Sequence, residues 1–134
     1  MSILLALTLA AGASAAPADP VIGLWSNPKG SLTVRTRRCG AQLCATVVSA
    51  SDKAKAKAAK AGVPQLIGTE IFSNYRRDGE DWAGTLYLPD RGMRVSSKLD
   101  VRDGRNMKIA GCVLGGMLCK SQVWTRVDTR MAGK

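Results

Sequence analysis

Four cysteines are the residues whose type and spacing most clearly predict a chemistry in this sequence. Cys39 and Cys44 form a C-x4-C pair, Cys112 and Cys119 form a C-x6-C pair, and histidine is absent. An even number of cysteines in a small chain with a candidate export signal predicts two disulfides. Of the three connectivities, short spacing favours the two local ones, Cys39–Cys44 and Cys112–Cys119. A zinc site of four thiolates is the alternative, but both spacings are poor for it, so we expect no metal.

The sequence offers no recognisable set of catalytic residues. Histidine, the commonest general base and metal ligand, is missing. Asp78, Asp90 and Asp103 fall in expected turns, where a carboxylate ordinarily accepts hydrogen bonds from the backbone. Glu70 and Asp100 are single carboxylates in expected strands. We therefore expect a protein that is not an enzyme and that requires no cofactor.

Turn-forming residues recur at short intervals and divide the chain into segments of strand length. Apolar and polar residues alternate in several of them; Leu32 and Val34, for example, alternate with Thr33 and Arg35. Period-two alternation between tight turns is typical of half-buried antiparallel strands. The expected strands span about 22–26, 31–38, 43–50, 66–76, 81–88, 92–101, 105–111 and 118–127.

One segment departs from this alternation. Residues 51–64 are rich in alanine and lysine, begin with Ser51 or Asp52 as a candidate N-cap, and end at Gly62 with Pro64 beyond. These start and stop signals predict a short helix between the third and fourth strands. Because the helix has no large apolar face, we interpret it as a solvated surface helix, with a mobile lid or a cationic handle as the alternatives.

Eight consecutive antiparallel strands form a meander, which closes naturally into an up-and-down barrel. We therefore predict an all-β barrel of about eight strands. Closure places the first strand antiparallel beside the last, which brings Trp25 next to Arg126. A guanidinium over an indole face contributes about 0.5–2 kcal/mol, and Gly23 allows a neighbouring group to approach closely. We expect Gly23, Trp25 and Arg126 to plug one end of the barrel, a structural role.

The sequence resembles two groups of proteins, one broad and one specific. Gly23-x-Trp25 on the first strand with Arg126 on the last resembles the signature of the calycins, the lipocalins and their relatives. The chain from 22 to 127 more closely resembles a bacterial family, domain-of-unknown-function family 2147, made of small exported lipocalin-like proteins. The resemblance implies a lipocalin-like barrel and export, and carries no established activity. The matching stretches are IGLW (22–25), RRCGAQLCATVV (37–48), LIGTEIF (66–72), DWAGTLYLPDRG (81–92) and GCVLGGMLCKSQVWTRV (111–127).

The beginning of the chain has the form of an export signal. An apolar run from Ile3 to Ala11 precedes Ala13-Ser14-Ala15, which matches a signal-peptidase site, although no lysine or arginine comes before the run. The run is too short to span a bilayer. We expect residues 1–15 to be a signal peptide cleaved after Ala15. Residues 16–134 would then be a single β-barrel domain in the periplasm, without a transmembrane segment; a buried N-terminal helix is the alternative.

Two functions remain open for such a barrel. In the first, the barrel is a carrier of a lipophilic or acyl-chain small molecule. One Phe, two Tyr and three Trp leave the interior incompletely filled, and eight-stranded barrels can hold one ligand. Expected inward residues that would line the pocket are Val34, Val47, Val95 and Leu99. Arg38 shares the strand parity of Leu32, Val34 and Thr36 and would hold a carboxylate or phosphate; a solvent-exposed strand end is the alternative for this residue.

In the second function, the barrel is solid and acts through its outer surface. The net charge of +10 results from 20 Lys and Arg against 10 Asp and Glu. Such a basic surface would bind anionic envelope components or a partner protein. Nucleic acid also fits the charge, but export and the small number of aromatic residues argue against it.

Overall fold

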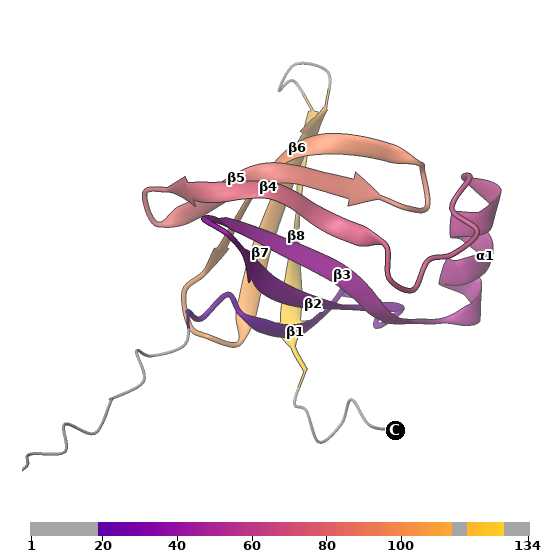
Figure 1. The fold of residues 1–134 in the computed structure, drawn as a ribbon, viewed down its shortest axis with the longest axis horizontal. Coiled ribbons are helices and arrows are strands. Elements are labelled where there is room, and N and C mark those ends of the chain that lie inside the picture. The colour runs from indigo at the N-terminus through magenta and orange to yellow at the C-terminus, as the bar shows by residue number, and fades with distance from the viewer. Residues whose placement is uncertain (1–18, 114–117, 128–134) are drawn as a thin grey trace, which may run out of the picture.

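The computed structural model describes residues 19–113 and 118–127 as a closed eight-stranded barrel with one helix (Figure 1). The expected signal peptide, residues 1–15, lies outside the described residues. Each strand pairs antiparallel with the next, so the predicted up-and-down barrel is confirmed. The elements are β1 (Gly23–Ser26), β2 (Leu32–Cys39), β3 (Gln42–Ala50), α1 (Asp52–Lys60), β4 (Glu70–Asp78), β5 (Asp81–Leu88), β6 (Met93–Val101), β7 (Asn106–Val113) and β8 (Leu118–Arg126).

The barrel closes through the pairing of β1 with β8. Trp25 lies opposite Arg126, and Ser26 lies opposite Thr125. The pairing continues just past the end of β8, where the Val127 amide donates to the Leu24 carbonyl over 2.9 Å. The two ends of the expected meander are therefore neighbours in space, as closure of an eight-stranded sheet requires.

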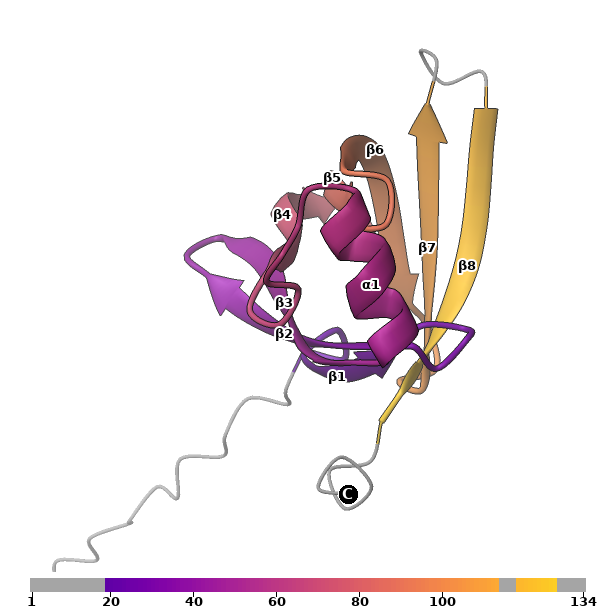
Figure 2. The same cartoon turned by 90° about the vertical axis from the view of Figure 1, so that its right-hand side faces the viewer.

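The helix α1 begins and ends close to where the sequence signals place it. The Ser51 hydroxyl accepts a hydrogen bond from the Ala54 amide over 3.1 Å and forms the N-cap. Ala58 is buried on the side that packs against the barrel, while the lysines remain exposed. Figure 2 shows α1 lying across one end of the barrel, which we call the open end.

The fourth strand begins at Glu70, four residues later than expected. Residues 66–69 form a turn instead, in which the Thr69 amide donates to the Leu66 carbonyl. Gly68 has φ +90°, a conformation that interrupts a strand. Further along β4, Asn74 has φ 59°, and the register with β5 shifts between Ser73 and Arg76. The apolar residues of this segment belong partly to the loop that follows α1.

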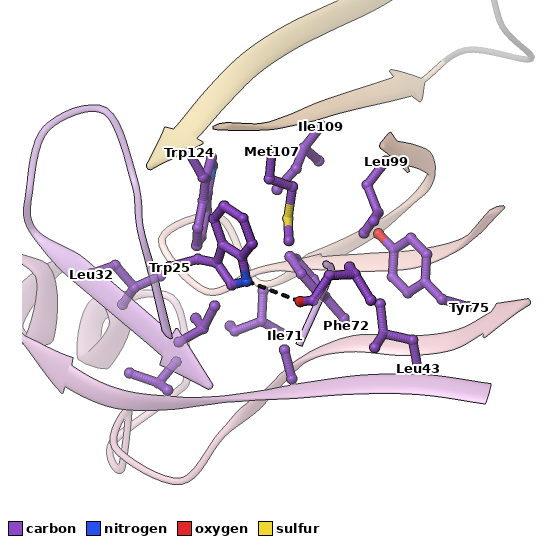
Figure 3. Packing of buried hydrophobic residues seen from close by; sticks show 14 of the residues in the cluster. Trp25, Leu32, Leu43, Ile71, Phe72, Tyr75, Leu99, Met107, Ile109 and Trp124 are labelled. Carbon is purple, nitrogen blue, oxygen red and sulfur yellow. Dashed lines mark hydrogen bonds between the residues drawn. The ribbon is translucent and has the colours of Figure 1, made fainter. Parts of the chain in front are cut away.

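The opposite end of the barrel, which we call the closed end, is filled by large side chains. Figure 3 shows them within the buried hydrophobic cluster, whose residues Leu32, Ile71, Ile109 and Trp124 border the open end. Phe72 lies between Tyr75 and Trp124, with ring centroids 5.2 and 6.1 Å away. Edge-on and tilted aromatic contacts of this kind are favourable. The fully buried residues around them include Trp25, Trp82, Leu43, Leu99 and Met107.

Two disulfides join neighbouring strands. Cys39–Cys44 links β2 to β3 near their turn at the closed end, and Cys112–Cys119 links β7 to β8 toward the open end. These are the two local pairings that the spacing favours. Among the residues that the structure describes, no helix is long and apolar enough to cross a membrane.

Candidate functional site

A cavity of about 820 Å³ occupies the open end, between α1 and the β7–β8 pair. Its walls come from α1, the loop between β1 and β2, the turn between β5 and β6, and the inner faces of β5 to β8. Cavities of about 300–1,000 Å³ accommodate small-molecule ligands. The barrel is therefore filled in one half and hollow in the other.

The floor of the cavity is apolar. Strand alternation points Leu86, Val95, Ile109 and Trp124 inward from four successive strands, β5 to β8. The Trp124 indole also donates a hydrogen bond to the Gln122 side chain over 3.0 Å, so its polar edge is satisfied within the cavity wall. The remaining apolar lining near the floor consists of Leu32, Leu66 and Ile71.

A glycine on the inner face of β7 helps to leave this space empty. Gly111 lies opposite Ser97 on β6 and Lys120 on β8, and it lines the cavity. A Cβ atom at this position would lie 3.2 Å from Val95 Cγ2 and 3.9 Å from Leu86 Cδ2. A larger side chain would extend over the floor, so Gly111 contributes to the volume available for a ligand.

The upper wall of the cavity is cationic. Lys53 and Lys57 project from the same face of α1, because residues four apart are neighbours on a helix, and Lys120 faces inward from β8. Asp90 is the carboxylate among the described lining residues. The cationic lining residues are Lys29, Lys53, Lys57, Arg91 and Lys120.

The pocket residues expected from the sequence are divided between the two ends of the barrel. Val95 lines the cavity. Val34, Val47 and Leu99 are inward and buried, but they belong to the packed core and are not part of the cavity lining. Strand parity alone therefore identified the inner face of the barrel without identifying its hollow half.

Arg38 lies at the closed end. It belongs to the row of alternate residues of β2 that begins with Leu32, and Leu32 lies at the cavity. The Arg38 guanidinium is 2.8 Å from the Asp19 carboxylate and 5.0 Å from the centre of the Trp82 ring. Arg77 contacts the same two groups from β4, at 3.6 and 4.8 Å. Arg38 is thus a half-exposed partner of Asp19 and Trp82, outside the described cavity.

The cavity residues of β8 were missed, although the sequence carried a signal for them. Cys112 and Cys119 lie directly opposite each other. Once this pair is assumed, antiparallel register places Lys120 opposite Gly111 and Trp124 opposite Met107. The inward face of β8 then follows from the buried neighbours on β7.

Arg126 closes the other end of the barrel. Its guanidinium lies 4.4 Å above the centre of the Trp25 ring and donates to the carbonyls of Ile22 (2.8 Å) and Gly104 (2.6 Å), and to that of Pro20. A Cβ on Gly23 would overlap the guanidinium, and the φ of this residue is +149°. The side chain therefore joins the start of β1, the β6–β7 turn and the end of β8.

Two buried hydroxyl groups, those of Tyr75 and Ser97, lie inside the barrel. Tyr75 is fully buried with its hydroxyl facing Ser97, and burial raises the pKa of the Tyr75 hydroxyl well above its usual value. Neither hydroxyl makes a hydrogen bond of ordinary geometry within the described part of the chain. Tyr75 stays protonated at neutral pH. The described residues also contain no cluster of three or more side chains that could ligate a metal.

Eight antiparallel strands in meander order, with Arg126 over Trp25 at one end and an apolar cavity at the other, define a lipocalin-like barrel. The chain belongs to the family described as "Uncharacterized protein conserved in bacteria (DUF2147)", whose model matches residues 23–126. The solved structure of protein HP1028 from Helicobacter pylori, described as belonging to the lipocalin family, is similar in fold. The two chains are 13% identical with a TM-score of 0.64, over 84% of this chain and 86% of that one. Curated proteins give no match.

Proposed function

We propose that this protein is a non-catalytic periplasmic binding protein that carries a lipophilic molecule with an acyl chain and an anionic end. The observation that carries the proposal is the cavity at the open end, with its apolar floor and cationic upper wall. A lipocalin-like barrel is an architecture suited to holding one small molecule inside. The ligand would enter beside α1 and lie with its chain toward Trp124.

The floor supports an apolar ligand through the hydrophobic effect. Burial of each methylene contributes roughly 0.8 kcal/mol, so a chain of several methylenes lying on Leu86, Val95 and Ile109 would bind without specific polar contacts. The floor side chains are held by the β-ladder and by the packed core beneath them. The cavity is therefore preformed, which limits the ordering cost of binding.

The cationic wall supports an anionic end on the ligand. Lys53, Lys57 and Lys120 approach the cavity from two elements, and a carboxylate or phosphate there would accept charge-assisted hydrogen bonds. We assign to these lysines the role that the sequence suggested for Arg38. The lysine side chains are flexible, so they would neutralise an anion without selecting one headgroup shape.

Export is supported by the disulfides and by the form of the N-terminal segment. Disulfides persist in oxidising compartments such as the bacterial periplasm, and this chain forms two. Residues 1–15 would be the signal peptide. The alternative of a solid barrel that acts through its basic outer surface is less well supported, because the cavity leaves one half of the barrel unfilled.

Quenching of tryptophan fluorescence by 9,10-dibromostearic acid tests the proposal, since bromine quenches an indole only at close range. Trp124 lines the cavity, whereas Trp25 and Trp82 are 0% and 2% exposed and lie outside its lining. We expect saturable, partial quenching of the wild type that is lost in Trp124→Phe and kept in the matched variant Trp82→Phe. Stearic acid without bromine is the control. Absence of quenching, or equal quenching in Trp124→Phe and wild type, would overturn the proposal.

A further inference from the structure

The cations that line the cavity at the open end form no ion pairs with other described residues. The four ion pairs found among the described residues all lie toward the closed end, where Asp19, Asp78 and Asp100 supply the carboxylates. Within the same described residues, none of these ion pairs involves a cation of the cavity wall. The lysines and the arginine at the open end are therefore available to an external anionic surface.

The same end carries exposed apolar side chains. Met93 is 39% exposed and Leu118 is 49% exposed, and both line the cavity at its rim. Met93 begins β6 after the β5–β6 turn, and Leu118 begins β8, so the two come from separate elements of the rim. Figure 2 shows β7 and β8 extending past the neighbouring strands beside α1. The rim thus combines apolar tips with cations around one opening.

We propose that the open end docks on an anionic phospholipid bilayer, with Met93 and Leu118 at the acyl boundary and the cations on headgroup phosphates. The proposal rests on the proposed function in one respect: a cavity for an acyl chain needs a source of acyl chains. With the opening against the bilayer, a ligand passes between membrane and cavity without exposing its chain to water.

The composition of the rim favours a bilayer over a protein partner. Lysine is depleted in protein–protein interfaces, whose cores are enriched in aromatic residues and arginine. Apolar residues bordered by lysine and arginine are typical of surfaces that lie in the membrane interface. The cationic lining residues outnumber the acidic one, Asp90, as binding to anionic lipid requires.

Flotation of the purified, oxidised protein with vesicles tests the docking. The vesicles are phosphatidylcholine alone or phosphatidylcholine containing phosphatidylglycerol. We expect binding only to the vesicles with phosphatidylglycerol, and a steep decrease as salt rises. Lys53→Glu with Lys57→Glu should lower the partition coefficient by about tenfold or more. The matched control is Lys55→Glu with Lys108→Glu, which changes the net charge equally at two exposed positions outside the cavity lining and should have much less effect.

The apolar contribution is tested separately. Met93→Ser with Leu118→Ser should weaken binding to the anionic vesicles several-fold, whereas Val123→Ser, at an exposed apolar residue away from the rim, should not. Equal binding to both vesicle types, or equal losses in the rim and control variants, would overturn the docking. Absence of vesicle binding with dibromostearate quenching intact would reject the docking alone; loss of quenching as well would reject the proposed function.

Discussion

Gly111 and Lys120 lie opposite each other in the β7–β8 pair, and both line the cavity at the open end. One position provides space and the other provides charge. The pair therefore lies where the apolar volume of the cavity meets its cationic wall. The Cys112–Cys119 disulfide lies directly beside this pair and holds its register.

A large side chain at Gly111 should weaken binding without unfolding the barrel. A leucine there would project over the floor toward Val95 and Leu86, whose nearest atoms would lie 3.2 and 3.9 Å from its Cβ. We expect Gly111→Leu to lower the affinity for dibromostearate by at least about tenfold and to cost at most about 1–3 kcal/mol of stability. Ala110→Leu, on the outer face of the same strand, is the matched control and should bind normally. Unchanged affinity in Gly111→Leu would place the ligand elsewhere.

The charge of Lys57 should affect the affinity for an anionic ligand but not the affinity for an uncharged one. We expect Lys57→Gln to weaken binding of dibromostearate by about three- to tenfold, or about 0.7–1.4 kcal/mol. Lys55→Gln on the same helix, outside the cavity lining, should have little effect. Competition by stearyl alcohol, which has no charge, should be the same in both variants. A similar loss for the alcohol would indicate that Lys57 acts through packing rather than charge.

The contact between Trp25 and Arg126 should dominate the stability of the closed end. Trp25 is fully buried, and its indole donates to the Val21 carbonyl over 3.0 Å. Trp25→Ala should lower the free energy of unfolding by about 3–5 kcal/mol, measured by urea denaturation of the oxidised protein. Val123→Ala, at an exposed position on β8, should change it by less than about 0.5 kcal/mol. A nearly unchanged midpoint for Trp25→Ala would contradict the structural role of this plug.

The fold could be predicted from the sequence because its signals are local. Alternation in segments such as Leu32–Arg35 and the turn residues between them determine the strands, and eight strands in a meander determine the closure. The start of β4 could not be predicted, because Leu66 and Ile67 are apolar like strand residues although Gly68 turns the chain. Their burial in the loop after α1 depends on packing that no local pattern records.

The candidate site was less predictable than the fold. Strand parity shows which side chains point into the barrel, but not how far along the barrel axis they lie. Arg38 and Leu32 share the inner row of β2, yet one lies at Trp82 and the other at the cavity. Separating them requires knowing which end of the barrel is filled, which depends on several large side chains from different strands. Lys57 presented a further difficulty, since a helix without a large apolar face gives no indication of the side that it turns to the barrel.

Acid should weaken the β6–β7 turn through Asp103. Hydrogen bonds from the Arg105 amide and from the side chain and amide of Asn106 lower the pKa of the Asp103 carboxyl from 3.8 to about 2. Since the folded-state pKa is the lower one, the stabilisation is present above about pH 4 and is lost as the pH falls toward 2. Asp103→Ala should therefore lower the urea midpoint at pH 7, and the gap to wild type should be much smaller at pH 2. An equal gap at both pH values would contradict this role.

The two disulfides should differ in their effect on binding. Each closes a short loop, so replacing either pair by alanine should cost roughly 2 kcal/mol of stability. Cys39–Cys44 lies at the closed end, whereas Cys112–Cys119 holds Gly111 and Lys120 in register at the cavity. We expect Cys112→Ala with Cys119→Ala to weaken dibromostearate binding several-fold, and Cys39→Ala with Cys44→Ala to leave it unchanged at a temperature where both variants are folded. Equal affinities would mean that the β-ladder alone positions the cavity wall.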